Sequence, residues 1–364
     1  MTGLAVPVYR QGRVTTVQRW FRWLDERGGI EGHPMAAVQA ALLSALTARP
    51  VNAERWADVV DRWQHGNRAQ PGDPAAEAWA AVLRALLCRH GVGQMRADAD
   101  EAGQRFAAGN LVEPAPVLFR GIAQILSGEL EGGDATFQDA ASIANETDAH
   151  DVIAVALCER SLLAVTRGDW GRAEVFADQA RTAVRRARLE ESYVTPLVCA
   201  AQAHIAMHRG DIPAARRELV SAQRLRGDLT YALPYLAVQA RVELARLHLA
   251  LADLEGARTL MREIDDLLRR RPGLGTLADA AQALRVQLAK RPTWNAPGAS
   301  ALTAAELRLL PMLSTHLSFP EIGQEMFLSR NTIKSGAMSI YRKLGVSSRN
   351  QAVTRSRELG LLEG

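Results

Sequence analysis

The chain has 364 residues, of which 48% are hydrophobic and 23% are charged, and its 44 basic and 40 acidic residues leave a net charge of +4. This composition is typical of a globular protein with room for two or three domains, and it excludes a chain that is disordered over its whole length. Residues 1–13 contain no apolar run of signal-peptide length, and no stretch approaches the ~18 consecutive apolar residues of a membrane span, so we expect a cytoplasmic protein with no membrane partner.

Residues 14–290 carry alanine and leucine at spacings of three and four, without alternating β-branched runs. This pattern predicts helices almost throughout and disfavours strand-based nucleotide-binding folds. One short motif recurs with its aspartates 42 residues apart, as Gly168-Asp169-Trp170, Gly210-Asp211-Ile212 and Ala252-Asp253-Leu254. Gly128-Glu129-Leu130 is a looser, earlier copy.

The recurring motif can end one helix and begin the next. Glycine readily adopts the left-handed conformation that closes a helix, and aspartate caps the next helix by accepting a backbone N–H bond. Stacked helical hairpins repeat in this way because each hairpin must bury its apolar face on the next. We therefore predict an all-α fold in which residues 1–290 form a tetratricopeptide-like helical-hairpin solenoid of about six hairpins.

The concave face of such a solenoid is a common place for a ligand or a partner protein. We expect the surface of residues 120–290 to bind a small-molecule or protein effector, with Arg160, Tyr231 and Tyr235 as candidate contacts. The alternative is a scaffold that binds no ligand.

Histidines and cysteines in this region could bind a metal or form a disulfide. His204 and His208 are four apart on one predicted helix, but the segment between them lacks the glutamate of a zinc-peptidase motif. Cys88, Cys158 and Cys199 lie singly in apolar stretches, which is typical of buried free thiols. We expect no metal, no disulfide and no cofactor.

Residues 291–300 contain two prolines and a glycine that interrupt any helix, so we expect a linker there between domains at 1–290 and 301–364. The second segment has eight basic and five acidic residues, which account for three of the four net positive charges. Thr303 and Glu306 form a capping box for a helix through about His316, which Pro311 should kink or shorten.

Three more helix starts follow. Ser318 and Glu321 form a second capping box for a short helix through Met326. Serines also cap a third helix over residues 330–344, ended by a glycine, and a fourth that runs to about Leu359. The tight turn around residues 327–329 between the second and third helices makes a helix-turn-helix.

The third helix has two distinct faces at 100° per residue. One side is apolar and should be buried, and consists of Ile333, Ala337, Ile340, Tyr341 and Leu344. The opposite side consists of Asn331, Ser335, Met338 and Arg342, with Lys334 at its margin. An amide, a hydroxyl, a thioether and two cations on one outward face suit base edges and phosphates in a DNA major groove, although a solvated surface helix could carry the same groups.

Ten residues or short motifs follow one another in a characteristic order: Leu302-Thr303, Glu306, Leu317-Ser318, Glu321-Ile322, Leu328-Ser329, Asn331-Thr332-Ile333-Lys334, Ile340-Tyr341-Arg342-Lys343-Leu344-Gly345-Val346, Arg349, Ala352-Val353 and Gly360-Leu361-Leu362. Together they closely resemble the LuxR-type domain over all of 301–364. The resemblance implies a four-helix domain that reads double-stranded DNA with its third helix, often as a homodimer whose contacts involve the fourth. Gly336 departs from the family, where a histidine is common.

Lys334, Ser335 and Met338 stand where members of that family touch bases or the adjacent backbone. The full set of candidate DNA-binding residues is Arg330, Asn331, Thr332, Lys334, Ser335, Met338, Arg342, Lys343 and Arg349.

The repeats together with this domain resemble the C-terminal half of large MalT-like regulators, which have an ATPase module before the repeats. This chain has no Gly-x-x-x-x-Gly-Lys-Ser/Thr phosphate loop and no βα receiver domain. We therefore predict a sequence-specific transcriptional regulator that is not an enzyme, is dimeric on DNA and binds an effector through its repeats, with RNA polymerase as a further candidate partner. The alternative is a helical-repeat scaffold whose terminal domain no longer reads DNA.

Overall fold

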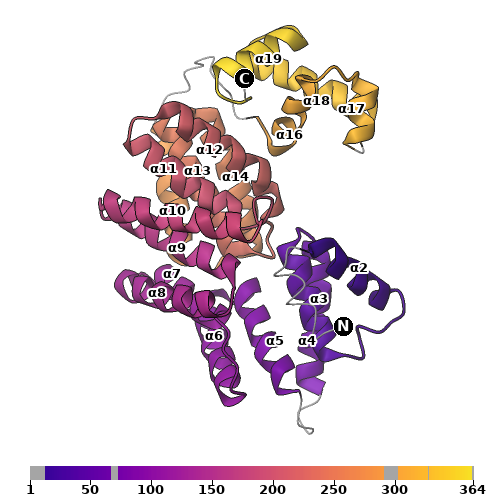
Figure 1. Ribbon diagram of the computed structural model, residues 1–364, viewed down its shortest axis with the longest axis vertical. Coiled ribbons are helices and arrows are strands. Elements are labelled where there is room, and N and C mark those ends of the chain that lie inside the picture. Colours follow the sequence, from indigo (N-terminus) through magenta and orange to yellow (C-terminus); the bar gives the residue numbers. More distant parts are fainter. Residues whose placement is uncertain (1–12, 67–72, 291–301, 327, 363–364) are drawn as a thin grey trace.

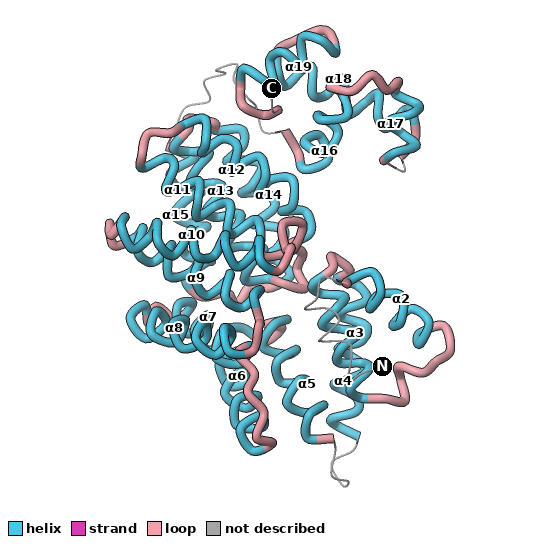
Figure 2. The backbone as a smooth tube through the Cα atoms, in the orientation of Figure 1, coloured by secondary structure: helices cyan, strands magenta, loops and turns pink. Residues whose placement is uncertain are grey.

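The computed structural model describes residues 13–66, 73–290, 302–326 and 328–362, and every regular element in these residues is a helix (Figures 1 and 2). The first half of the chain forms α2 (Val14–Asp25), α3 (Pro34–Leu46), α4 (Pro50–Gly66), α5 (Pro74–Leu87), α6 (Gly91–Ala108), α7 (Ala115–Leu126), α8 (Leu130–Glu146), α9 (His150–Thr166) and α10 (Trp170–Arg186). The second half forms α11 (Thr195–His208), α12 (Ile212–Leu225), the 3-10 turn η1 (Arg226–Asp228), α13 (Pro234–Ala250), α14 (Leu254–Arg270), α15 (Thr276–Ala289), α16 (Ala304–Leu313), α17 (Phe319–Glu325), α18 (Arg330–Leu344) and α19 (Arg349–Glu358). The predicted all-α fold is confirmed.

Consecutive helices from α3 to α14 pack as hairpins, in the pairs α3–α4, α5–α6, α7–α8, α9–α10, α11–α12 and α13–α14. We call this stack, together with α15, the repeat array. The first helix of each hairpin has at least half of its residues buried, whereas the second helix buries one stripe. Fourteen of the 17 residues of α13 are buried, for example, but only five of the 17 residues of α10. This division is the expected result of stacking hairpins in a tetratricopeptide-like solenoid.

The recurring motif has the predicted conformation in all three copies. Its first residue is left-handed each time, with φ of 73° at Gly168, 75° at Gly210 and 59° at Ala252. The following aspartates cap α10, α12 and α14 by accepting bonds from backbone N–H groups three residues on, at 3.1, 2.9 and 2.9 Å. The sequence period therefore marks the turn inside each of these hairpins.

The repeat array curls until its last loop contacts its first half. The segment between α14 and α15 touches the ends of α5 and α7, because Arg271 Nε donates to Leu87 O at 3.1 Å and Thr276 Oγ1 donates to Ile125 O at 3.1 Å. The backbones meet closely where Val92 N donates to Gly273 O at 3.1 Å, and a Cβ atom on Gly273 would lie 2.8 Å from the Cα of Gly91. Glycine at this contact allows the loop to close on the array.

Helices α16–α19 bury a hydrophobic cluster of their own, and we call them the four-helix unit. Its core includes Leu310, Ile322, Ile333 and Ile340, and none of these side chains belongs to the core of the repeat array. The unit lies at one end of the molecule beside α12, whose Val220 packs against its core (Figure 1). The predicted linker, residues 291–300, lies outside the described residues, so the domain division stays a prediction. Among the described residues, no helix is both long enough and apolar enough to cross a membrane.

Candidate nucleic-acid interface

Side chains at the helix starts fix the first two helices of the four-helix unit. Thr303 N donates to Glu306 Oε2 at 2.6 Å while Glu306 N donates to Thr303 Oγ1 at 3.3 Å, which completes the predicted capping box of α16. Ser318 N and its hydroxyl both donate to Glu321 Oε2, at 2.7 and 2.6 Å, at the start of α17. Helix α16 ends at Leu313, two residues after Pro311 and before His316. The proline therefore shortens the helix, which is one of the two effects expected from the sequence.

The turn between α17 and α18 requires a glycine that the sequence analysis did not identify. Leu328 N donates to Gly323 O at 2.8 Å, so the chain folds back tightly over the end of α17. A Cβ atom on Gly323 would lie 2.7 Å from Leu328 O, which no side chain could accept without moving the turn. Ser329 then caps α18 by accepting from Thr332 N at 3.1 Å.

Helix α18 presents the two faces that its sequence predicts. The five residues of the apolar stripe are all buried, namely Ile333, Ala337, Ile340, Tyr341 and Leu344. On the other side Asn331, Lys334 and Arg342 are exposed, and Met338 has 58% of its surface in solvent. Ser335 is also exposed, and its hydroxyl donates to the carbonyls of Asn331 and Thr332 at 3.0 Å. We call these five residues the outward face.

Lys343 and Arg349 lie outside the outward face and have partners within the four-helix unit. Lys343 Nζ donates to Glu306 Oε2 at 2.6 Å. Burial alone would raise the pKa of Glu306, but the hydrogen bonds from Lys343 and from the backbone of Thr303 hold it below its ordinary value. Arg349 donates to the carbonyls of Met312, Leu313, Thr315 and Leu317, at 3.2, 2.8, 2.8 and 2.7 Å. Arg349 thereby joins the start of α19 to the last two residues of α16 and to the loop that follows them.

Two further candidates flank the start of α18. Arg330 is exposed at the first position of the helix, and the Thr332 hydroxyl lies 2.8 Å from that of Ser329. Gly336 lies between the two faces, and a Cβ atom there would be 2.9 Å from Leu309 Cδ2 of α16. Leu309 therefore fills the space that a side chain at position 336 would occupy.

The candidate effector residues are engaged inside the repeat array. Arg160 Nε donates to Asp134 Oδ1 at 2.8 Å, and its guanidinium lies 4.3 Å from the ring centre of Phe176. Tyr235 is only 4% exposed, and burial raises the pKa of its hydroxyl well above the ordinary value. Tyr231 is half-buried beneath the guanidinium of Arg270, 4.8 Å from its ring centre.

Both histidines considered as metal ligands have other partners. His204 Nε2 lies 2.9 Å from Glu243 Oε2, and the ring of His208 stacks on Trp170 with centroids 3.9 Å apart.

A cavity of about 130 Å³ lies between the first helices of four hairpins, and the sequence analysis did not identify it. Its walls are mostly apolar and come from α2, α3, α5, α7 and α9. The Tyr193 hydroxyl donates to Asp151 Oδ2 at 2.9 Å on one side of it. No sequence pattern marks the cavity, because its lining is spread over residues 17–193.

Comparison with known proteins identifies the four-helix unit. Residues 300–356 match the family described as GerE, bacterial regulatory proteins of the luxR family. No curated protein and no solved structure matches the chain. The match covers α16, α17, α18 and most of α19, including the whole helix-turn-helix. The four-helix unit is therefore a domain of the luxR family of bacterial regulatory proteins, which supports a DNA-binding role for this part of the chain.

Proposed function

We propose that the chain recognises specific double-stranded DNA sequences through the outward face of α18 and that it binds as a homodimer. The observation that carries this proposal is the exposure of Asn331, Lys334, Met338 and Arg342 on one side of the second helix of a helix-turn-helix. That helix is the one that enters the major groove in this motif. Such a face is suited to binding DNA, so we infer that the chain acts by regulating transcription and not by catalysis.

Within the predicted set, the exposed residues are the base-reading and phosphate-binding groups of this proposal. Lys343 and Arg349 take a positioning role, since their hydrogen bonds hold α16 against α18 and α19. An asparagine side chain can pair with adenine through two hydrogen bonds, whereas a lysine supplies a charge that any phosphate can use. Sequence discrimination therefore depends on Asn331, and general affinity depends on Lys334 and Arg342.

The test is a binding titration of the full chain against duplexes selected from a random pool and against unselected duplexes, at several salt concentrations. Tighter binding to the selected duplexes, in a 2:1 complex, is the expected result. A chain that binds no duplex even at low salt would instead support the alternative of a repeat scaffold with an assembly module.

We also propose that the repeat array binds an apolar effector in the cavity between α3, α5, α7 and α9. Its volume of about 130 Å³ is close to that of engineered apolar cavities that admit benzene. The adjacent pair of Asp151 and Tyr193 supplies a polar end. Arg160 and Tyr235, by contrast, serve the packing of the array in this proposal.

The effector site can be tested by thermal unfolding of the full chain with increasing indole. Ligand that binds only the folded chain raises the Tm with concentration. Leu46→Trp, which adds bulk at the half-buried rim of the cavity, should abolish this rise, and Val51→Trp at a position 71% exposed should leave it unchanged. An equal rise in both variants would place the indole elsewhere.

A further inference from the structure

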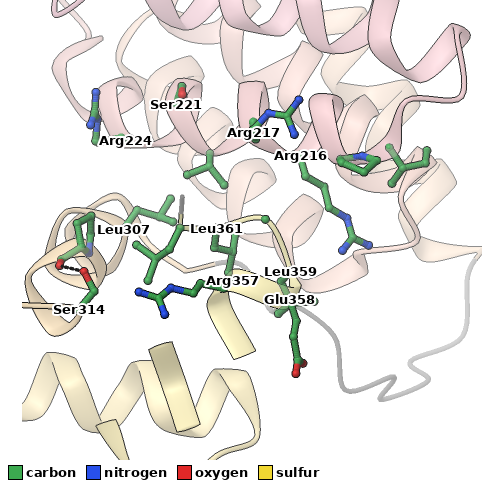
Figure 3. A pocket seen from close by; sticks show the side chains of 16 residues that line it. Arg216, Arg217, Ser221, Arg224, Leu307, Ser314, Arg357, Glu358, Leu359 and Leu361 are labelled. Atoms are coloured by element: carbon green, nitrogen blue, oxygen red, sulfur yellow. Dashed lines mark hydrogen bonds between the residues drawn. The ribbon is translucent and has the colours of Figure 1, made fainter. Parts of the chain in front are cut away.

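A cleft of about 840 Å³ separates α12 of the repeat array from the four-helix unit (Figure 3). One wall is α12, and the other is formed by α16 and by the end of α19 with the residues that follow it. The two parts also touch, because Val220 of α12 packs on the core of the four-helix unit. Neither α17 nor α18 contributes to the lining, so the cleft is distinct from the outward face.

Positive charge dominates the lining of this cleft. Its arginines are Arg216, Arg217 and Arg224 from α12 and Arg357 from α19, and among the described lining residues Glu358 is the one carboxylate. Arg224 Nη2 pairs with Glu191 at 2.7 Å. Across the part of the chain that the structure describes, the other three arginines have no ion pair. Among the described residues, no carboxylate therefore forms an ion pair with the guanidinium groups of Arg216, Arg217 and Arg357.

Two of the arginines, one from each wall, extend into the cleft, whereas Arg217 and Arg224 stay beside α12 (Figure 3). In Figure 3, Arg216 extends from α12 toward the four-helix unit, Arg357 lies on the opposite side beside Leu361, and Glu358 points away from α12. Between the charges the surface is apolar, with Val220, Leu307, Leu359, Leu361 and Leu362 in the lining. The cleft therefore combines a cationic rim with an apolar floor.

We propose that this cleft binds a small phosphate-bearing molecule with an apolar or aromatic part. The planar guanidinium matches two phosphate oxygens at once, and arginine is the side chain best suited to such a contact. The leucines and Val220 would take the apolar part, whose burial adds affinity that a free phosphate ion lacks. Because the arginines come from both walls, one bound molecule ties the repeat array to the DNA-binding domain.

A small molecule fits these observations better than a DNA backbone. The cationic groups line a concavity and surround an apolar floor, whereas phosphate-binding residues for a duplex need to follow its outer surface. The site does not depend on the proposed reading of DNA by α18, and it is separate from the cavity between α3 and α9.

The experiment is isothermal titration of the full chain with phenyl phosphate, with inorganic phosphate and with phenol. Phenyl phosphate should bind at least about tenfold more tightly than either fragment, which corresponds to ~1.4 kcal/mol. Arg216→Gln and Arg357→Gln should each weaken its binding by about tenfold, while Arg186→Gln, an exposed arginine on α10, should leave it unchanged. Circular dichroism of each variant checks that the fold is kept.

Four outcomes would overturn the proposal. Binding that is equal in wild type and in both cleft variants would place the ligand elsewhere, and absence of binding would remove the site. Equal affinity for phenyl phosphate and inorganic phosphate would show that the apolar floor takes no part. Loss of affinity for unselected duplex DNA in Arg216→Gln, without phenyl phosphate binding in wild type, would assign the arginines to DNA instead.

Discussion

Lys343, in the last turn of α18, donates a hydrogen bond of 2.6 Å to Glu306 in the first turn of α16. The same carboxylate oxygen accepts from Thr303 N at 2.6 Å. One glutamate therefore caps its own helix and anchors the helix that carries the outward face. We therefore expect the position of α18 to depend on the ionisation of this carboxylate.

The pKa of Glu306 is lower in the folded chain than its ordinary value of 4.5, so the ionised group stabilises the fold. This stabilisation is present above pH 4.5 and is lost as the pH falls through the folded pKa. Glu306→Gln should therefore remove part of the acid sensitivity of the four-helix unit. Hydrogen exchange of peptides from α18 between pH 3 and 7 measures it, because the sequence from 301 to 364 contains no tryptophan. An unchanged pH dependence in the variant would contradict this role.

Lys343→Gln should destabilise the four-helix unit by about 1–3 kcal/mol, because it leaves the buried carboxylate of Glu306 without its cation. Lys334→Gln is the matched control, since Lys334 is exposed on the same helix. Faster exchange in α18 is expected for the first variant and wild-type exchange for the second. Equal exchange in both variants would show that the ion pair contributes nothing to the position of α18.

Arg349→Ala should lower the stability of the four-helix unit by about 2–3 kcal/mol, because up to four carbonyls lose a charged donor. Arg355→Ala on the same helix is the control, since among the described residues its side chain pairs with exposed Glu358, at 2.9 Å. Hydrogen exchange in α16 and α19 distinguishes the two variants. A large loss of DNA affinity in Arg349→Ala without any loss of stability would return this residue to the DNA-binding set.

Asp211→Ala and Asp253→Ala should each destabilise the repeat array, the first by about 1 kcal/mol through loss of the helix cap. Asp253→Ala should reduce the stability by more than Asp211→Ala does, because the second carboxylate oxygen of Asp253 also lies 2.8 Å from Nδ1 of buried His248. Urea unfolding followed by tryptophan fluorescence measures both. A smaller effect for Asp253 than for Asp211 would mean that the histidine contact adds nothing.

Local sequence chemistry predicts the parts of this structure that depend on neighbouring residues. The 42-residue period predicts the hairpin turns because glycine and aspartate act within one turn of the backbone. The buried stripe of α18 follows from helical spacing alone, and both capping boxes follow from residues three apart. These features need no knowledge of distant segments.

Features that join distant segments could not be predicted in this way. Arg349 looks like a free cation in the sequence, but its carbonyl acceptors lie 32 to 37 residues earlier. The loop contact between Arg271 and Leu87 spans 184 residues, and the arginines of the cleft come from α12 and α19. Composition and spacing carry no information about such pairs, because only the folded backbone brings them together.

The two parts of the chain should fold independently. Their hydrophobic clusters are separate, and Val220 is a half-buried contact between them. Limited proteolysis should cut first within residues 291–300 and leave two resistant fragments, because few contacts should oppose cleavage there. A single resistant fragment that spans both parts would contradict the predicted domain division.

The outward face of α18 allows affinity and specificity to be separated with two variants. Lys334→Gln should weaken binding to selected and unselected duplexes alike and reduce the slope of log K against log salt by about 0.9, because one phosphate contact is lost. Asn331→Ala should leave that slope unchanged, since the amide carries no charge. It should cost about 1–3 kcal/mol on the selected duplex and far less on unselected DNA.

Gln324→Ala is the matched control for Asn331→Ala, because it removes an exposed amide on α17 that lies outside the predicted DNA-binding set. Fluorescence anisotropy with the full chain at four salt concentrations gives the slope and the ratio of the two affinities from one data set. The specificity ratio should fall for Asn331→Ala and stay near wild type for Lys334→Gln. If both variants reduce the affinity for every duplex equally, the outward face supplies only charge, and discrimination between sequences must come from another part of the domain.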